Sequence, residues 1–230
     1  MSEVDGILDA TAAVIDIWKF GWGTAYLDRQ LHRKLRALDD ASVLGCTGGT
    51  LLEIAWAQKR ATEFFDWVAD VGIHCVEVSN GATGLPLSAK RELLAEALSR
   101  GLTVLSEVGS KDPTHRADAD EWVAEMVGDL AAGATWVVAE GRESGTVGMY
   151  DSAGTIRTDI VAAIEAAVDP ARVIYEAPRR EQQAGLIRRL GPSVNLGNVA
   201  PADIMGVESL RVGLRTDTLN LSTVMSSCQQ

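Results

Sequence analysis

The chain of 230 residues contains no apolar run that approaches the roughly 20 residues of a membrane-spanning helix. Its first residues, Met-Ser-Glu-Val-Asp, lack the basic start of a signal peptide. No proline- or serine-rich linker and no low-complexity stretch divides it. These absences predict a cytoplasmic protein with one domain over residues 1–230, in which residues 219–230 form a C-terminal tail.

Basic residues are also few relative to acidic ones. The chain has 21 Lys and Arg against 32 Asp and Glu, which gives a net charge of −11 at pH 7. Nucleic acid and anionic membrane would be repelled at long range, so we expect neither as a partner. A small anionic molecule stays open as a substrate, provided that a few cations converge on it.

Cysteine is scarce, and its spacing excludes two common frameworks. Cys46, Cys75 and Cys228 form no Cys-x-x-Cys pair and are odd in number, so neither a zinc site nor a set of disulfides is indicated. Cys46 and Cys75 fall in β-rich runs, where we expect them to act as small apolar core residues.

The chain does have a regular alternation of short β-rich runs with longer helical patterns, which is typical of a parallel sheet covered by helices. The runs are residues 13–20, 42–46, 74–79, 103–108, 135–140, 172–176 and 193–198. An eight-stranded barrel typically needs about 250 residues, slightly more than this chain has. We therefore expect an α/β fold, a TIM-type (β/α) barrel with seven visible strands.

The segments between these runs have helical periodicity. Leu31, Leu35 and Leu38 recur at spacings of three and four, as the apolar face of a helix does. Gly72 is expected to end one helix and Ser88 to cap the start of the next.

Four of the runs end in or beside a glutamate, at Glu77, Glu107, Glu140 and Glu176. In an α/β barrel the carboxyl ends of the strands surround one site, so these side chains should converge. Four converging carboxylates repel one another unless a cation lies among them. Oxygen ligands without histidine favour Mg²⁺ or Mn²⁺ over zinc. For each glutamate alone, an ion pair with a neighbouring Arg or Lys on the rim explains the position equally well.

Cationic side chains also follow the strand ends, which suggests a local trap for an anion in an acidic protein. They include Lys19, Lys111, Arg142 and Arg215. The last run carries Asn195, Gly197 and Asn198 and leads to a helix expected to begin at Pro201. A glycine turn before a helix can cradle phosphate, although ordinary turns between strands and helices use the same residues.

Taken together, these motifs resemble the phosphosulfolactate synthase family, whose archaeal members act in coenzyme M biosynthesis. The matching segments are Lys19-Phe-Gly-Trp-Gly-Thr24, Gly48-Gly-Thr-Leu51 with Glu53, Val76-Glu-Val-Ser79, Ser106-Glu-Val-Gly109 with Lys111, Glu140-Gly-Arg-Glu-Ser-Gly145, Glu176-Ala-Pro178 with Gln182-Gln183, Val194-Asn-Leu-Gly-Asn198, and Leu210-Arg211 with Gly213-Leu-Arg215 and Asp217-Thr218. They occur in order over residues 13–218.

The resemblance implies a barrel enzyme, a carbon–sulfur lyase, that adds sulfite to phosphoenolpyruvate with Mg²⁺ and yields 2-phospho-3-sulfolactate. Charge pushed into the substrate carboxylate would give an aci-carboxylate, and carbon 2 would then take a proton. Lys111 is the expected acid, and Glu140 its catalytic companion. Metal ligands would be Glu77, Glu107 and Glu176. Substrate-binding residues would be Lys19, Arg142, Ser144, Asn195, Gly197, Asn198 and Arg215. We also expect a homo-oligomer.

Three departures from the family pattern keep other functions open. Asn80 stands where the family has Asp, and Thr216 where it has Gly. The family also has a strand before the one at Lys19, and only residues 1–12 precede that run here. Two exposed sheet edges would result. The tail or a partner subunit is one candidate to cover them, and a longer upstream reading frame is the alternative.

Two other functions stay open, the first because of these departures and the second because of the range of proteins in the family. One is a related barrel enzyme that uses another nucleophile or another phosphorylated enol in specialised metabolism. The other is a non-catalytic member like the plant heat-stress proteins that resemble this family. The retained cations and carboxylates argue against the second.

Overall fold

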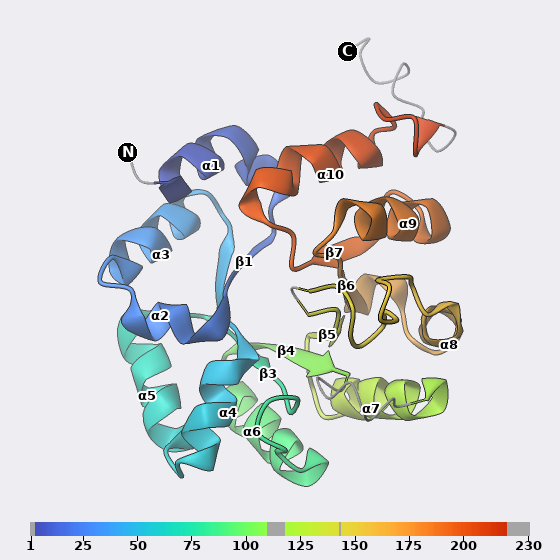
Figure 1. Cartoon of the computed structure of the whole chain (residues 1–230). Helices are drawn as coiled ribbons and strands as arrows, with labels where there is room; N and C mark the ends of the chain where they lie inside the picture. Colours follow the sequence, from blue (N-terminus) through green and yellow to red (C-terminus); the bar gives the residue numbers. More distant parts are fainter. Residues whose placement is uncertain (1–2, 110–117, 143, 220–230) are drawn as a thin grey trace.

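The computed structural model describes residues 3–109, 118–142 and 144–219 of the chain. Seven parallel strands form one sheet in the order β1-β2-β3-β4-β5-β6-β7. The sheet curls into a half-barrel with helices on its outside (Figure 1). The strands are β1 Ile17–Phe20, β2 Leu44–Thr47, β3 Cys75–Val78, β4 Thr103–Val108, β5 Trp136–Ala139, β6 Val173–Glu176 and β7 Asn195–Gly197. The predicted TIM-type α/β fold is confirmed.

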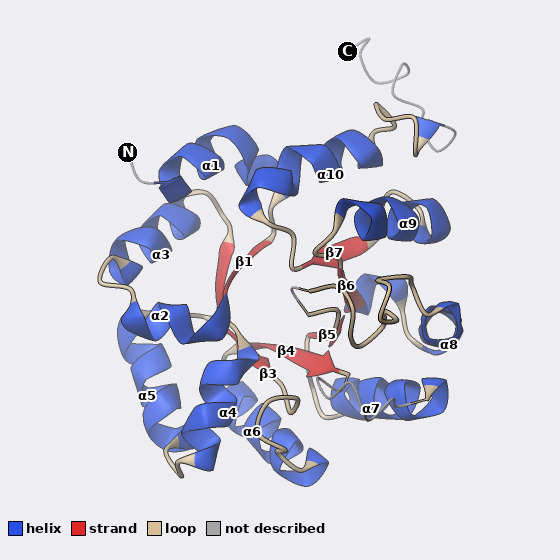
Figure 2. Ribbon diagram, viewed as in Figure 1, coloured by secondary structure: helices blue, strands red, loops and turns tan. Residues whose placement is uncertain are grey.

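Helices connect the strands and cover the outer face of the sheet (Figure 2). The α-helices are α1 Glu3–Thr11, α2 Thr24–Leu27, α3 Leu31–Asp40, α4 Gly49–Ala57, α5 Ala61–Val71, α6 Leu87–Ser99, α7 Ala119–Ala131, α8 Thr158–Ala167, α9 Arg180–Leu190 and α10 Ile204–Arg211. Short 3₁₀ turns are η1 Ala12–Val14, η2 Gly21–Gly23, η3 Pro170–Arg172 and η4 Pro201–Asp203. Among the described residues no helix is long and apolar enough to cross a membrane.

The helix ends agree with the sequence at one predicted position and differ at another. Gly72 ends α5 in the left-handed conformation, with φ 79°, as expected. The prediction that Ser88 caps the next helix is wrong, because α6 already begins at Leu87 and Pro86 is its N-cap residue. Pro86 suits that place, since its φ is fixed near −63° and no backbone N–H is lost from the helix.

Because strand residues alternate, one face of the sheet is apolar and packs against the helices. The interior face is apolar in one part and polar toward the carboxyl ends of the strands. Val76 and Val78 of β3 pack in the core cluster under the helices. Interior strand residues form a small apolar cluster of Cys46, Cys75, Leu105 and Val138. The two cysteines are buried and free, as predicted. Two residues closer to the carboxyl ends, three of these four residues are followed by Glu77, Glu107 and Glu140.

The sheet has two edges. Within the described residues β1 pairs with β2 alone and β7 with β6 alone, so the half-barrel is not closed by strand pairing. Outside it, α10 packs beside α9, and α1 beside α3 (Figure 1). The predicted tail lies outside the described residues except for Leu219, so its role in covering the edges stays a prediction.

Candidate active site

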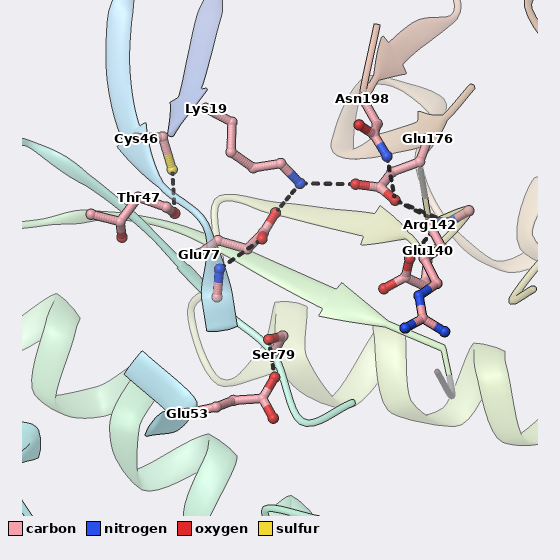
Figure 3. A network of polar contacts seen from close by, with 12 residues as sticks. Lys19, Cys46, Thr47, Glu53, Glu77, Ser79, Glu140, Arg142, Glu176 and Asn198 are labelled. Carbon is pink, nitrogen blue, oxygen red and sulfur yellow. Dashed lines mark hydrogen bonds and ion pairs between the residues drawn. The ribbon is translucent and has the colours of Figure 1, made fainter. Parts of the chain in front are cut away.

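A lysine from the first strand lies between two glutamates from distant strands (Figure 3). Lys19 Nζ donates hydrogen bonds of 2.8 Å to Glu77 Oε2 on β3 and of 2.8 Å to Glu176 Oε1 on β6. About 25% of the Lys19 side chain is exposed, whereas both carboxylates are 3% exposed. The interior of the half-barrel therefore holds a fixed cation near its carboxyl edge, within reach of solvent.

The charge environment keeps this lysine protonated. Burial alone would lower the pKa of Lys19, but Glu176, Glu77 and Glu107 together hold it well above its ordinary value. An ammonium held this firmly is a poor proton donor at neutral pH. Lys19 is suited to attract an anion.

Glu77 also anchors the start of helix α4. Its Oε1 accepts a 2.9 Å hydrogen bond from the backbone N–H of Gly49. A Cβ on Gly49 would lie 2.2 Å from Ser79 Oγ, so only glycine allows this approach. Burial, reinforced by Glu107 and Glu176 and opposed by Lys19, raises the pKa of Glu77 to about 6. This carboxyl therefore takes up a proton more readily than an ordinary glutamate.

Three carboxylates lie close enough together to share a cation. Glu107 ends β4, Glu140 follows β5 and Glu176 ends β6, and all three are buried. One oxygen from each lies within 4.8 Å of the others. Three hard oxygen donors in a buried group are the ligands that Mg²⁺ and Mn²⁺ prefer, and no imidazole or thiol belongs to the group. The residues present therefore fit a divalent cation of that class.

Backbone amides hold two of these carboxylates. Glu176 Oε2 accepts hydrogen bonds from the N–H groups of Gly141 (3.0 Å) and Arg142 (3.2 Å), and from Asn198 Nδ2 at 3.5 Å. The Arg142 amide also donates to Glu140 Oε1 at 2.5 Å. Arg142 and Asn198 have φ of 50° and 51°, a left-handed backbone that non-glycine residues seldom adopt. Such strain clusters where a site must be held rigidly.

Comparisons with known proteins show to which family the chain belongs. The family model described as (2R)-phospho-3-sulfolactate synthase (ComA) matches residues 1–217. The chain belongs to the phosphosulfolactate synthase family. A Bacillus subtilis (strain 168) phosphosulfolactate synthase is 40% identical over 210 residues, covering 90% of this chain and 83% of that protein.

Two archaeal phosphosulfolactate synthases are similar to a comparable extent. The one from Methanothermobacter thermautotrophicus is 38% identical over 93% of this chain and 84% of its own length. The one from Methanocaldococcus jannaschii is 36% identical over 94% of this chain and 88% of its own length. Among solved structures, the Amycolatopsis orientalis BexX/CysO complex aligns with a TM-score of 0.57 at 17% identity, covering 97% of this chain and 86% of that one, which shows likeness of fold alone.

The structure brings most of the predicted site residues of this synthase family member to one edge. Lys19, the four glutamates, the Arg142 backbone and Asn198 are joined by the contacts described above. Gly197 pairs with Glu176, and a Cβ there would lie 2.9 Å from Ile174 Cγ2. Glu77 was expected to bind metal with Glu107 and Glu176, but the compact group holds Glu140 in its place.

Three other predicted substrate-binding residues have different partners. Asn195 begins β7 beside Ile174, and its amide donates to the carbonyls of Val173 (3.0 Å) and Pro170 at the amino end of β6. Ser144 is exposed and its hydroxyl lies 2.9 Å from that of Thr146. Arg215 follows α10 and lies near Asp217 in a cleft between α9 and α10. Lys111 lies outside the described residues.

Sequence reasoning assigned no role to a buried carboxylate on α4 that shapes the loop after β3. Glu53 accepts the Ser79 hydroxyl and the backbone N–H groups of Ala82 (2.7 Å) and Thr83 (2.8 Å). An acidic residue on a predominantly apolar helix, four residues after Gly48-Gly49, was the available signal.

Proposed function

We propose that this protein adds sulfite to phosphoenolpyruvate and releases 2-phospho-3-sulfolactate. The observation that carries the proposal is the Lys19 ammonium beside a group of three buried carboxylates, at the carboxyl edge of a barrel of this family. The substrates are anions, and a net charge of −11 would repel them without a local cation. The site supplies that cation in Lys19 and can hold a second one.

The reaction sets three requirements for the site. The sulfur of sulfite forms a bond with the methylene carbon of the enol, and the electron pair of the double bond moves toward the substrate carboxylate. Carbon 2 then takes a proton and the pair returns to form the C–H bond. The site must therefore bind two anions together, stabilise charge on the carboxylate oxygens and deliver one proton.

Glu107, Glu140 and Glu176 are the proposed ligands of Mg²⁺. Glu77 is the fourth carboxylate and is joined to Glu176 through Lys19. When bound, the metal would polarise the substrate carboxylate as the new bond forms. The neighbouring amides fix the ligand oxygens, since the Arg142 N–H contacts both Glu140 and Glu176.

Other residues are proposed to bind the anionic substrates and to donate the proton. Lys19 presents its ammonium to an entering anion, and Arg142, whose side chain is exposed at the same edge, offers a second cation. Gly197 and Asn198 lead into the turn η4 that begins at Pro201, a place suited to phosphate. Lys111, which matches the family motif that follows β4, is the proposed acid at carbon 2. The raised pKa of Lys19 makes Lys19 itself a poor proton donor.

Mass spectrometry of the protein incubated with phosphoenolpyruvate, sulfite and Mg²⁺ tests the proposal directly. We expect the adduct from the wild-type chain, and its loss in Lys111→Ala and Glu107→Gln variants that stay folded. The Bacillus subtilis relative serves as the positive control. If that enzyme forms the adduct and this chain does not, the proposed reaction is wrong.

The same assay separates the two alternatives. Product from another nucleophile or another phosphorylated enol would support a related enzyme, which Asn80 in place of the family's Asp motivates. No turnover of any such pair would favour a non-catalytic member. Cytoplasmic location and homo-oligomerisation stay predictions.

A further inference from the structure

A cluster of buried charges lies behind strand β4, on the helix side of the sheet. We call it the Lys90 cluster; it consists of Lys90 on α6, Glu125 and Asp129 on α7, and Ser106 on β4. Lys90 and Asp129 are both 0% exposed, and their charged atoms lie 2.8 Å apart. Lys90 Nζ also lies 2.7 Å from Glu125 Oε1. None of these four side chains takes part in the reaction proposed above.

The cluster touches the candidate metal group through the backbone. Lys90 Nζ donates a 2.7 Å hydrogen bond to the carbonyl oxygen of Glu107, one of the three grouped carboxylates. An ammonium has three N–H donors, and Glu107, Glu125 and Asp129 supply three acceptors for it. The position of Lys90 is therefore fully determined by its partners.

A second contact involves Ser106, the residue before Glu107 on β4. Ser106 Oγ donates to Asp129 Oδ2 at 2.7 Å. Ser106 faces the helices and Glu107 faces the interior, because successive strand residues alternate. Two consecutive residues are thus tied to one ion pair, Ser106 by its side chain and Glu107 by its carbonyl. Fixing the plane of that carbonyl fixes the direction in which the Glu107 side chain leaves the strand.

Stability alone is a weak reason for such a cluster. Burying an ion pair costs solvation that its Coulomb attraction repays only in part, and apolar residues of the same volume often stabilise as well or better. An apolar pair could not bind a carbonyl oxygen at the end of a strand. The geometry calls for a role in orientation.

We propose that Lys90, held by Asp129, is a positioning residue that orients Glu107 toward Glu140 and Glu176 for binding a divalent cation. The inference rests on the proposed function, in which those three carboxylates bind the metal. Lys90 itself touches neither metal nor substrate. Groups that hold the ligands of a metal typically change its affinity by roughly 10- to 100-fold.

The test is a titration of the metal-free full chain with Mn²⁺, followed by electron paramagnetic resonance of the free ion. Lys90→Met alone leaves Asp129 buried without its principal cation, so the Lys90→Met/Asp129→Asn double variant, which removes both charges, is measured beside it. We expect the double variant to bind Mn²⁺ roughly 10-fold or more weakly. Its melting temperature is recorded in parallel.

Two controls separate orientation from general stability. Arg91→Met removes a partially exposed contact of 3.2 Å to Asp129 but leaves the bond from Lys90 to Glu107, so its affinity should stay within about twofold of wild type. Leu38→Ala empties a buried place on α3, which should lower the melting temperature without changing Mn²⁺ affinity.

The outcomes are distinct. If the double variant binds Mn²⁺ as tightly as wild type, or loses affinity only as much as Leu38→Ala, the positioning role is overturned. If wild type binds Mn²⁺ no better than Glu107→Gln, the proposed metal group fails first and the positioning role fails with it.

Discussion

Lys19 Nζ and Glu176 Oε1 lie 2.8 Å apart although their strands are separated by four others in the sheet. The contact crosses the interior of the half-barrel and joins residues 157 positions apart in the chain. Among the described residues, β1 and β7 are the edges of the sheet, so this ion pair links the edge strand β1 to β6 on the opposite side of the half-barrel. Lys19 therefore joins two sides of the half-barrel and is also the proposed anion-binding group.

Replacing Lys19 by methionine should therefore separate metal binding from turnover. Without the ammonium, Glu176 loses its competing cation and Mn²⁺ should bind at least as tightly as to wild type. Turnover should fall by about 100-fold or more, because an orienting and charge-stabilising contact to the anionic substrate is lost. Mn²⁺ titration and the adduct assay on the same preparation measure both effects.

The matched control for this variant is Lys34→Met, which removes a partly exposed ion pair with Asp28. That change should cost under about 1 kcal/mol of unfolding free energy and leave turnover intact. A Lys19→Met protein that turns over normally would show that the ammonium does not bind substrate.

Neutralising the glutamates one at a time tests which of them bind the metal. Glu107→Gln, Glu140→Gln and Glu176→Gln should each weaken Mn²⁺ binding by about tenfold or more, since each removes a charged oxygen ligand. Glu53→Gln, in an equally buried carboxylate outside the group, is the control and should bind normally. Glu77→Gln and Glu140→Gln together decide between the two ligand sets: a loss in Glu77→Gln as large as that in Glu107→Gln, with normal binding by Glu140→Gln, would place Glu77 in the metal site instead of Glu140.

The convergence of the glutamates was predictable because it depends only on strand alternation and on the parallel sheet. Interior residues alternate along each strand, and the carboxyl ends of parallel strands meet at one edge, so glutamates at these ends should face one another. Asn195 shows where this reasoning stops. Register pairs Asn195 with Ile174, two residues before Glu176, and so places it at the bottom of the interior. A sequence pattern marks the existence of a strand and leaves its depth in the sheet undetermined.

Contacts between residues that are distant in the chain could not be predicted from the sequence either. Nothing in the spacing of Lys19 and Glu176 indicates that they meet, because the meeting depends on how far the sheet curls. Arg215 follows α10, and its position beside α9 depends on how α10 packs. The Lys90 contact with the Glu107 carbonyl involves backbone, which carries no signal in the sequence.

The pKa of Glu77 predicts a pH-dependent contribution to stability. Because the pKa is raised from 4.5 to about 6 in the folded chain, the folded state binds this proton more tightly than the unfolded state. The contribution of Glu77 is therefore largest below pH 4.5 and is lost as the pH rises through 6, by roughly 2 kcal/mol in all.

Urea unfolding of wild type and Glu77→Gln in the presence of a chelator, from pH 4 to pH 7, measures this contribution. The glutamine mimics the protonated carboxyl at every pH, so the variant should gain on wild type as the pH rises. A difference that stays constant over the range would contradict a raised pKa.

Gly49 is a position where a single added methyl group should destabilise the fold. A Cβ there would lie 2.2 Å from Ser79 Oγ and 2.7 Å from Ser79 Cβ, and neither can move without disturbing Glu53 or the strand end. Relief of the clash would also pull the Gly49 N–H away from Glu77 Oε1. We expect Gly49→Ala to cost about 1–3 kcal/mol of unfolding free energy and to reduce turnover. Gly6→Ala, in open space on α1, should instead stabilise by about 0.5–1 kcal/mol, so equal effects at the two positions in urea unfolding would contradict the steric argument.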